Sequence, residues 1–198
     1  MMRRKNYAGL IALIFCLGLL SGLVQAQVAV PQAVMVIAPE NFQDQELLVT
    51  KQVLEQGEVK VTVASTTQAE CRGMQGAKVK PDILLRDIKA TDFDAVIFVG
   101  GSGASIFFDD PTALEVARQA AAQGKVVAAI CIAPVTLAKA GLLSGKKATV
   151  YPSAKKELEQ AGATYTGAAV SVDGKLITAS GPPAATAFGQ AILRQLQP

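Results

Sequence analysis

A cysteine stands where a predicted strand turns into a predicted helix. The mostly apolar run from Lys125 to Ile130 has the length and composition of a buried strand, Cys131 follows it directly, and Pro134 suits the first turn of a helix. At such a junction, free backbone N–H groups and the positive end of the helix dipole favour the thiolate. Cys131 is therefore a candidate nucleophile, although a small buried cysteine that only ends a strand would give the same pattern.

Two glycines could supply groups that hold an oxyanion beside this cysteine. Gly100 and Gly101 follow a second buried run, and their N–H groups could act together with that of Ile132. A plain strand-to-loop turn would also use glycines at these positions. A phosphate-binding loop is a further alternative, but the segment lacks the spacing and the lysine of such loops.

An acidic residue near a helix start is the third candidate. Glu46 comes shortly after the first predicted strand, where its carboxyl group could hydrogen-bond a thiol. A carboxylate in the first turn of a helix also matches the helix dipole without any catalytic role. The sequence around Glu46 leaves both interpretations open.

The chain contains no histidine. This absence excludes Ser-His-Asp and Cys-His catalytic pairs, as well as zinc sites built on histidine. The two cysteines that follow the N-terminal segment, Cys71 and Cys131, are too few and too far apart in the sequence for a typical metal site. We therefore expect neither a metal nor a cofactor.

The first 26 residues have the three-part pattern of a secretory signal. Residues 3–5 are basic, residues 8–24 are uncharged and mostly apolar, and small residues precede a cleavage site after Ala26. The apolar stretch is short for a bilayer span, so we expect cleavage and a periplasmic or secreted protein, with a retained membrane anchor as the alternative. In an oxidising compartment, Cys71 and Cys131 could also form a disulfide.

The positive charge of the chain belongs to this N-terminal segment. Of 19 basic and 16 acidic residues, three basic and no acidic ones lie within the first 26 positions, so the remainder is formally neutral. A neutral chain without a basic stripe does not predict nucleic-acid binding. We expect a small-molecule partner, and contact with a membrane only through the signal before its cleavage.

Strands and helices alternate along the rest of the sequence, which favours a single α/β domain over residues 33–198. The expected architecture is a mostly parallel sheet with helices on both faces and a binding site at the carboxyl ends of the strands. Apolar or alternating runs predict strands at 33–38, 58–65, 79–84 (a strand or hairpin), 94–99, 125–130, 148–151, 168–172 and 176–179. Helices are predicted at 45–56, 111–123, 134–140 and 184–196, with Asp44 and either Asp109 or Asp110 as caps of the first two.

Five segments in the same order make the chain resemble the ThiJ/PfpI family. They are PENFQDQEL (39–47), VGGSG (99–103), AAICIAP (128–134), GLLSGKKATVYPS (141–153) and SGPP (180–183). The resemblance covers residues 33–196 and implies a flavodoxin-like α/β sandwich with a nucleophile elbow, commonly as a homodimer.

The resemblance also implies a role for each candidate residue. Cys131 matches the elbow nucleophile. Glu46 matches an acid, usually protonated, that hydrogen-bonds the cysteine and helps to lower its pKa. The backbone N–H groups of Gly101 and Ile132 match the oxyanion donors, and Gly100 is their neighbour.

The chain departs from the family pattern at two positions. Ile132 stands where protease-like members carry a histidine directly after the cysteine, which argues against a Cys-His protease. Tyr151 stands where deglycase-like members carry a histidine before the proline, here Pro152. Tyr151 is a possible neighbour of the site, but its phenol is a poor base at neutral pH.

These residues predict a cysteine enzyme that acts on reactive carbonyl compounds in stress defence, with glyoxalase-like or deglycase-like activity. A lyase, hydratase or amidase reaction could use the same groups. The alternative is a non-enzymatic redox sensor or holdase chaperone in which an oxidant converts Cys131 to a sulfinic acid.

Overall fold

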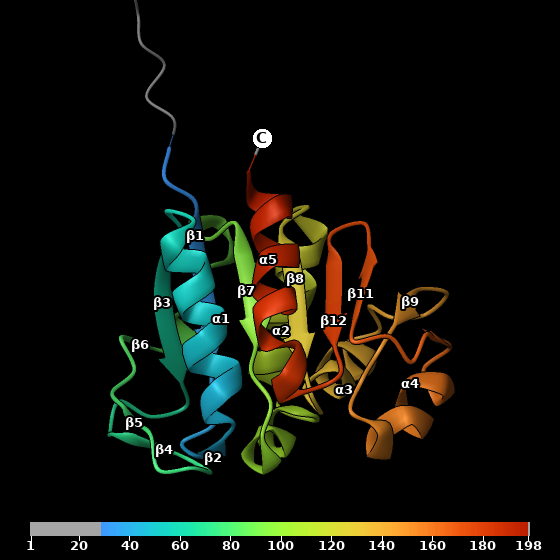
Figure 1. Ribbon diagram of the computed structural model, residues 1–198, viewed down its shortest axis with the longest axis horizontal. Helices are drawn as coiled ribbons and strands as arrows, with labels where there is room; N and C mark the ends of the chain where they lie inside the picture. Colours follow the sequence, from blue (N-terminus) through green and yellow to red (C-terminus); the bar gives the residue numbers. More distant parts are fainter. Residues whose placement is uncertain (1–28, 198) are drawn as a thin grey trace, which may run out of the picture.

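The computed structural model describes residues 29–197, which fold around a seven-stranded sheet (Figure 1). The strand order is β11-β12-β8-β7-β1-β3-β6, and every neighbouring pair is parallel except β11 with β12. The strands are β1 (Gln32–Val36), β3 (Lys60–Ser65), β6 (Ile83–Leu84), β7 (Ala95–Phe98), β8 (Val126–Ile130), β11 (Val170–Asp173) and β12 (Leu176–Ala179). The expected signal and its cleavage site lie outside the described residues.

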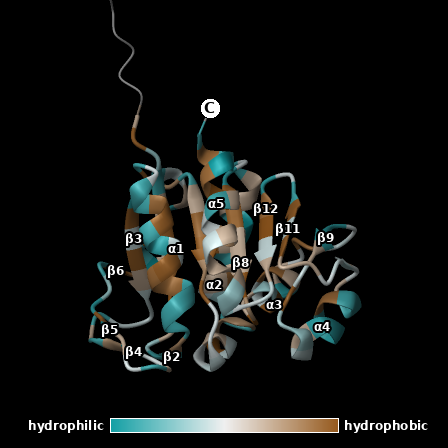
Figure 2. Ribbon diagram, viewed as in Figure 1, coloured by the Kyte–Doolittle hydropathy of each residue, from teal (hydrophilic) through white to brown (hydrophobic). Residues whose placement is uncertain are grey.

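Helices cover both faces of the sheet, as the alternation of strands and helices predicts. Alternate residues of β1 belong to separate apolar clusters. Val34 lies in the cluster on the face covered by α2, and Met35 lies in the cluster on the face covered by α1 and α5. The helices are α1 (Asp44–Gln56), α2 (Pro111–Ala122), α3 (Pro134–Lys139), α4 (Lys155–Gln160) and α5 (Ala185–Leu196). Figure 2 shows apolar residues concentrated on the central strands and hydrophilic residues on α4 and the outer loops. The flavodoxin-like α/β fold is confirmed.

Two small sheets and several short helices complete the described part of the chain. One sheet joins β2 (Glu40–Phe42), β4 (Cys71–Gly73) and β5 (Lys78–Val79), and the other joins β9 (Lys147–Ala148) and β10 (Thr164–Tyr165). The 3-10 helices are η1 (Leu85–Asp87), η2 (Ala90–Asp92), η3 (Ser102–Phe107), η4 (Pro152–Ala154) and η5 (Pro182–Ala184). Within residues 29–197, no helix has the length and hydropathy needed to cross a membrane.

Two predicted strands differ in the structure. The run 79–84 is neither one strand nor a hairpin, because β5 pairs antiparallel with β4 while β6 pairs parallel with β3 in the main sheet. Pro81 lies between them, and it has no N–H to donate to a neighbouring strand of a sheet. The run 148–151 is a strand only at its first residue, since Pro152 directs the chain into η4.

The cap of α1 also differs from the prediction. Gln43, not Asp44, caps the helix, and its side chain accepts a hydrogen bond from the N–H of Glu46. Asp44 is instead a buried acceptor for the N–H groups of Gln75 and Ala77, at 2.8 and 2.7 Å. Asp110 caps α2 as predicted.

The sheet order brings three loops together. Strands β1, β7 and β8 are neighbours, and their carboxyl ends lie on the same edge of the sheet. The segments that follow them contain Glu46, Gly100 with Gly101, and Cys131, respectively. A site at this edge is what an open parallel sheet favours.

Candidate active site

Cys131 occupies a sharp turn between β8 and α3. Its φ of +62° lies in the left-handed region, which costs a residue other than glycine about 1–2 kcal/mol. Two hydrogen bonds hold it there: its N–H donates to the carbonyl of Ala179 at 2.9 Å, and its carbonyl accepts from the N–H of Tyr151 at 2.8 Å. The residue is only 8% exposed, so Cys131 lies in a tight turn at the strand end with little access to solvent.

Glu46 reaches this cysteine from the first turn of α1. Its side chain is fully buried, and Oε2 accepts a hydrogen bond from the N–H of Gly100 at 3.0 Å. Oε1 has no hydrogen-bond partner among residues 29–197, and the carboxyl group also interacts with the thiol of Cys131. The structure therefore brings the predicted acid and the predicted nucleophile together.

The two glycines allow this close approach. A Cβ on Gly100 would lie 2.5 Å from Cβ of Cys131 and 2.6 Å from Oε2 of Glu46, so no larger residue fits between them. Gly101 has a φ of +98°, which favours glycine. Its N–H and that of Ile132 both reach the sulfur of Cys131. The predicted oxyanion donors thus converge on the predicted nucleophile.

Burial controls the protonation of both groups. Desolvation raises the pKa of Glu46 from its ordinary 4.5 to about 7, against the opposing hydrogen bonds from Cys131 and Gly100. Desolvation also raises the pKa of Cys131 to about 12, and the negative charge of Glu46 adds to this rise. The N–H groups of Gly101 and Ile132 oppose it without cancelling it.

The raised pKa of Glu46 agrees with the protonated, hydrogen-bonded acid that the resemblance implies, but Glu46 raises the pKa of Cys131 instead of lowering it. Above pH 7, the carboxyl group has lost its proton and the thiol has kept its own, so the negative charge of Glu46 raises the pKa of Cys131. A thiol beside a carboxylate is not a preformed thiolate. It is a nucleophile next to a base whose pKa lies close to neutral pH, where general-base catalysis is most effective.

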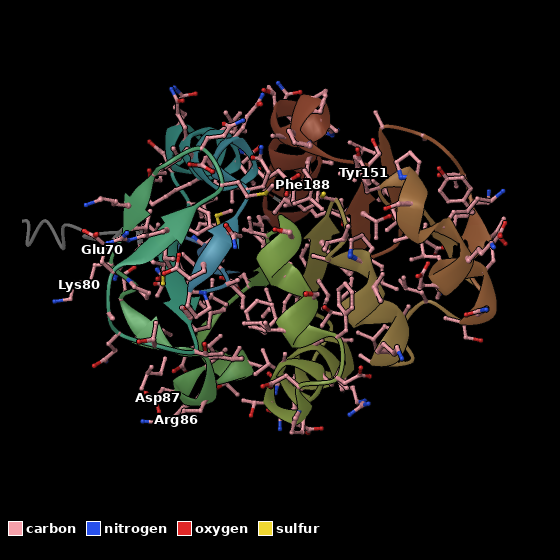
Figure 3. All side chains as sticks on the ribbon, turned by 90° about the horizontal axis from the view of Figure 1, so that it is seen from below. Glu70, Lys80, Arg86, Asp87, Tyr151 and Phe188 are labelled. Carbon is pink, nitrogen blue, oxygen red and sulfur yellow. The ribbon has the colours of Figure 1, made fainter. Side chains whose placement is uncertain are left out.

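The other candidate residues lie at or outside this centre. Tyr151 lies on the carboxyl edge of the sheet, which Figure 3 views from below, and its side chain is 45% exposed. Its backbone N–H bonds the carbonyl of Cys131, but the side-chain hydrogen bonds of the described site residues do not include its hydroxyl. Cys71 is on β4, and both it and Cys131 are free and buried, so the disulfide alternative is wrong for this structure.

Gln43 is a site residue that the sequence analysis missed. Its side chain caps α1 through the N–H of Glu46 at 3.0 Å, and its own N–H donates to the carbonyl of Gly100 at 2.9 Å. These two bonds fix Glu46 relative to Gly100. Glutamine is not among the residues that usually cap helices, so its position alone gave no signal.

Comparison with known proteins identifies the family. Residues 32–195 match the profile of the DJ-1/PfpI family. The chain belongs to the DJ-1/PfpI family. An uncharacterised relative in this family, from Methanocaldococcus jannaschii, is 43% identical over 169 residues, which are 84% of this chain and 82% of that protein.

Other DJ-1/PfpI relatives carry functional names. A glutathione-independent glyoxalase of Caenorhabditis elegans is 28% identical, over 83% of this chain and 88% of its own length. A deglycase of Pyrococcus abyssi is 31% identical, over 75% of this chain and 90% of its own length.

Solved structures of the family have the same fold. A ThiJ/PfpI domain protein from Brachyspira murdochii superposes with a TM-score of 0.82 at 30% identity, over 83% of this chain and 95% of that one. DJ-1beta of Drosophila melanogaster gives a TM-score of 0.77 at 32% identity, over 85% of this chain and 91% of its own.

Proposed function

We propose that this protein is a cofactor-independent glyoxalase that converts α-oxoaldehydes to 2-hydroxy acids through Cys131. The observation that carries the proposal is the buried pair of Cys131 and Glu46, whose carboxyl group interacts with the thiol, together with the backbone N–H groups of Gly101 and Ile132 at the sulfur. The glyoxalase and deglycase names of two relatives support reactive carbonyl compounds as the substrate class.

The first step is addition of the thiol to the aldehyde. The sulfur of Cys131 forms a bond to the aldehyde carbon while the thiol proton passes to the carboxylate of Glu46. The former carbonyl oxygen gains the electron pair of its π bond, and the N–H groups of Gly101 and Ile132 hold the resulting oxyanion. That oxygen then takes the proton from Glu46, which gives a hemithioacetal and restores the carboxylate of Glu46.

The second step moves hydrogen within the bound substrate. Glu46 takes the hydrogen of the first carbon as a proton to give an enediolate and returns a proton to the second carbon. The hydroxyl proton on the first carbon passes to the oxygen on the second carbon, so the hemithioacetal becomes a thioester of a 2-hydroxy acid. Water cleaves the thioester and restores the thiol. The sum is one oxoaldehyde plus one water giving one hydroxy acid, with no external oxidant or reductant.

Oxidation of the same cysteine is a second candidate function. The observation that favours it is Oε1 of Glu46, which is buried and has no hydrogen-bond partner among the residues that the structure describes; when protonated, it would donate to an oxygen of a sulfinic acid at Cys131. Mild peroxide would then add the mass of two oxygen atoms at Cys131. Oxidation of Cys71 or of methionines alone, with Cys131 unchanged, contradicts this candidate.

We also propose that the protein is exported and acts as a homodimer. The export proposal rests on the signal pattern of residues 1–26, and mass analysis of protein from an expressing bacterium tests it by locating the mature N-terminus. Gln27 as the first residue supports cleavage after Ala26, and a retained Met1 contradicts it. Light scattering on the purified protein tests the homodimer.

Lactate formation from methylglyoxal tests the glyoxalase proposal directly. The wild-type protein should produce lactate without added thiol or metal, and Cys131→Ala should produce none. Glu46→Gln keeps an acceptor for the N–H of Gly100 but has no carboxylate, so it should lose most of the activity, typically 10²-fold or more. Equal rates for the wild type and Cys131→Ala contradict the proposal.

A further inference from the structure

The two flanks of Cys131 differ in chemistry. Strand β8 lies between β7 and β12, so the elbow has Gly100 and Gly101 on one side and the segment after β12 on the other. Glu46 and the N–H of Gly101 occupy the β7 side. Because Glu46 and Gly101 fill the β7 side, the β12 side is left for the remaining substituent of a carbonyl compound whose oxygen is held by the N–H groups of Gly101 and Ile132.

Tyr151 is fixed on that β12 side. Its N–H bonds the carbonyl of Cys131 at 2.8 Å, and its own carbonyl accepts from the N–H of Ala154 at 2.9 Å. Pro152 follows it and restricts its backbone, which has a φ of −55° and a ψ of 135°. The direction of its side chain is thus set by the same backbone that positions the nucleophile.

The ring of Tyr151 lies against a glycine and is open to solvent. Its Cδ2 and Cε2 atoms are 3.4 and 3.9 Å from the place that a Cβ on Gly181 would take, and Gly181 has a φ of +148°, where side chains are rarely tolerated. Tyr151 is 45% exposed, so its large side chain is accessible to a ligand. Its position on the carboxyl edge is visible in Figure 3.

The ionisable groups at the nucleophile do not offer a charged contact to a substituent. Glu46 is fully buried against Gly100 and Cys131, and Cys131 is itself 8% exposed. The backbone of Tyr151 contacts Cys131, and its aromatic side chain is large and exposed. Selection at this flank must therefore rest on apolar and stacking contact, not on charge.

We propose that Tyr151 is a specificity-determining residue whose ring forms an apolar wall beside Cys131 and favours α-oxoaldehydes with a flat, apolar substituent over those with a methyl group. The inference rests on the proposed glyoxalase function for its turnover assay. The ring stacks on the substituent while the hydroxyl plays no required part, because no described residue hydrogen-bonds it.

Steady-state kinetics with phenylglyoxal and methylglyoxal test whether Tyr151 sets this preference. The ratio of kcat/KM for phenylglyoxal to that for methylglyoxal should fall on the order of fivefold in Tyr151→Ala and should stay near the wild-type ratio in Tyr151→Phe. Val172→Ala is the matched control, since Val172 is a similarly exposed apolar residue, at 46%, on β11. An unchanged ratio in Tyr151→Ala, or an equal loss for both substrates, overturns the proposal.

A second measurement tests the role of Tyr151 without relying on glyoxalase turnover. Phenacyl bromide and bromoacetone alkylate a thiol by forming a carbon–sulfur bond and releasing bromide, so they report on Cys131 even if no oxoaldehyde is turned over. The ratio of their rates at Cys131, followed by peptide mass, should favour the phenyl reagent in the wild type and in Tyr151→Phe. Loss of this preference in Tyr151→Ala supports the wall, and its persistence overturns it.

Discussion

Replacement of Glu46 by glutamine should stabilise the protein, and the gain should grow with pH. Burial raises the pKa of Glu46 from 4.5 to about 7. Between these two values the folded state binds more protons than the unfolded state, so the stability of the wild type falls as pH rises through this window and stays low above it. A difference of about 2.5 pKa units corresponds to about 3 kcal/mol.

Glutamine can keep the hydrogen bond from the N–H of Gly100 but does not titrate. The stability of Glu46→Gln relative to the wild type should therefore be about 3 kcal/mol higher at pH 8 than at pH 4.5. Urea unfolding curves of both proteins at several pH values, all below the ordinary pKa of a thiol, measure the difference. A constant difference across this range would refute the assignment of a raised pKa to Glu46.

Three other substitutions test the geometry around the elbow. Gly100→Ala places a Cβ within 2.5 Å of Cys131 and 2.6 Å of Glu46, so it should lower the free energy of unfolding by about 1–3 kcal/mol and abolish activity, as urea titration and lactate assays would measure. Cys131→Gly should be about 1 kcal/mol more stable than Cys131→Ala in thermal or urea unfolding, because glycine adopts a φ of +62° without strain; a less stable glycine variant contradicts this reasoning. Gln43→Ala removes the cap that accepts from the N–H of Glu46 and should lower the free energy of unfolding by about 1 kcal/mol. It should also reduce activity more strongly than the control Gln52→Ala, at an exposed position of the same helix α1.

The sequence was sufficient to predict the layers and the edge that contains the site. Buried runs followed by Gly101 and Cys131 identify strand ends, and parallel strands place such ends together. Strand β12 and the cap Asp110 were predicted correctly because their signals are local. These features depend on residues only a few positions apart.

The parts that could not be predicted depend on distant neighbours. Asp44 has the chemistry of a cap, yet its carboxylate bonds N–H groups more than 30 residues away, at Gln75 and Ala77. The pKa of Glu46 depends on how deeply the folded chain buries it, which no local pattern reveals. For the same reason, the direction of its effect on Cys131 was predicted wrongly.

The pH dependence of Cys131 alkylation tests the central claim that Glu46 acts as the base for this thiol. The rate of modification by iodoacetamide, followed at the Cys131 peptide, should rise with a midpoint near pH 7 in the wild type, as Glu46 loses its proton. In Glu46→Gln this rise should be absent and modification should increase only at strongly alkaline pH. A wild-type rate that is already maximal at pH 5, or an identical profile in the two proteins, would contradict the account.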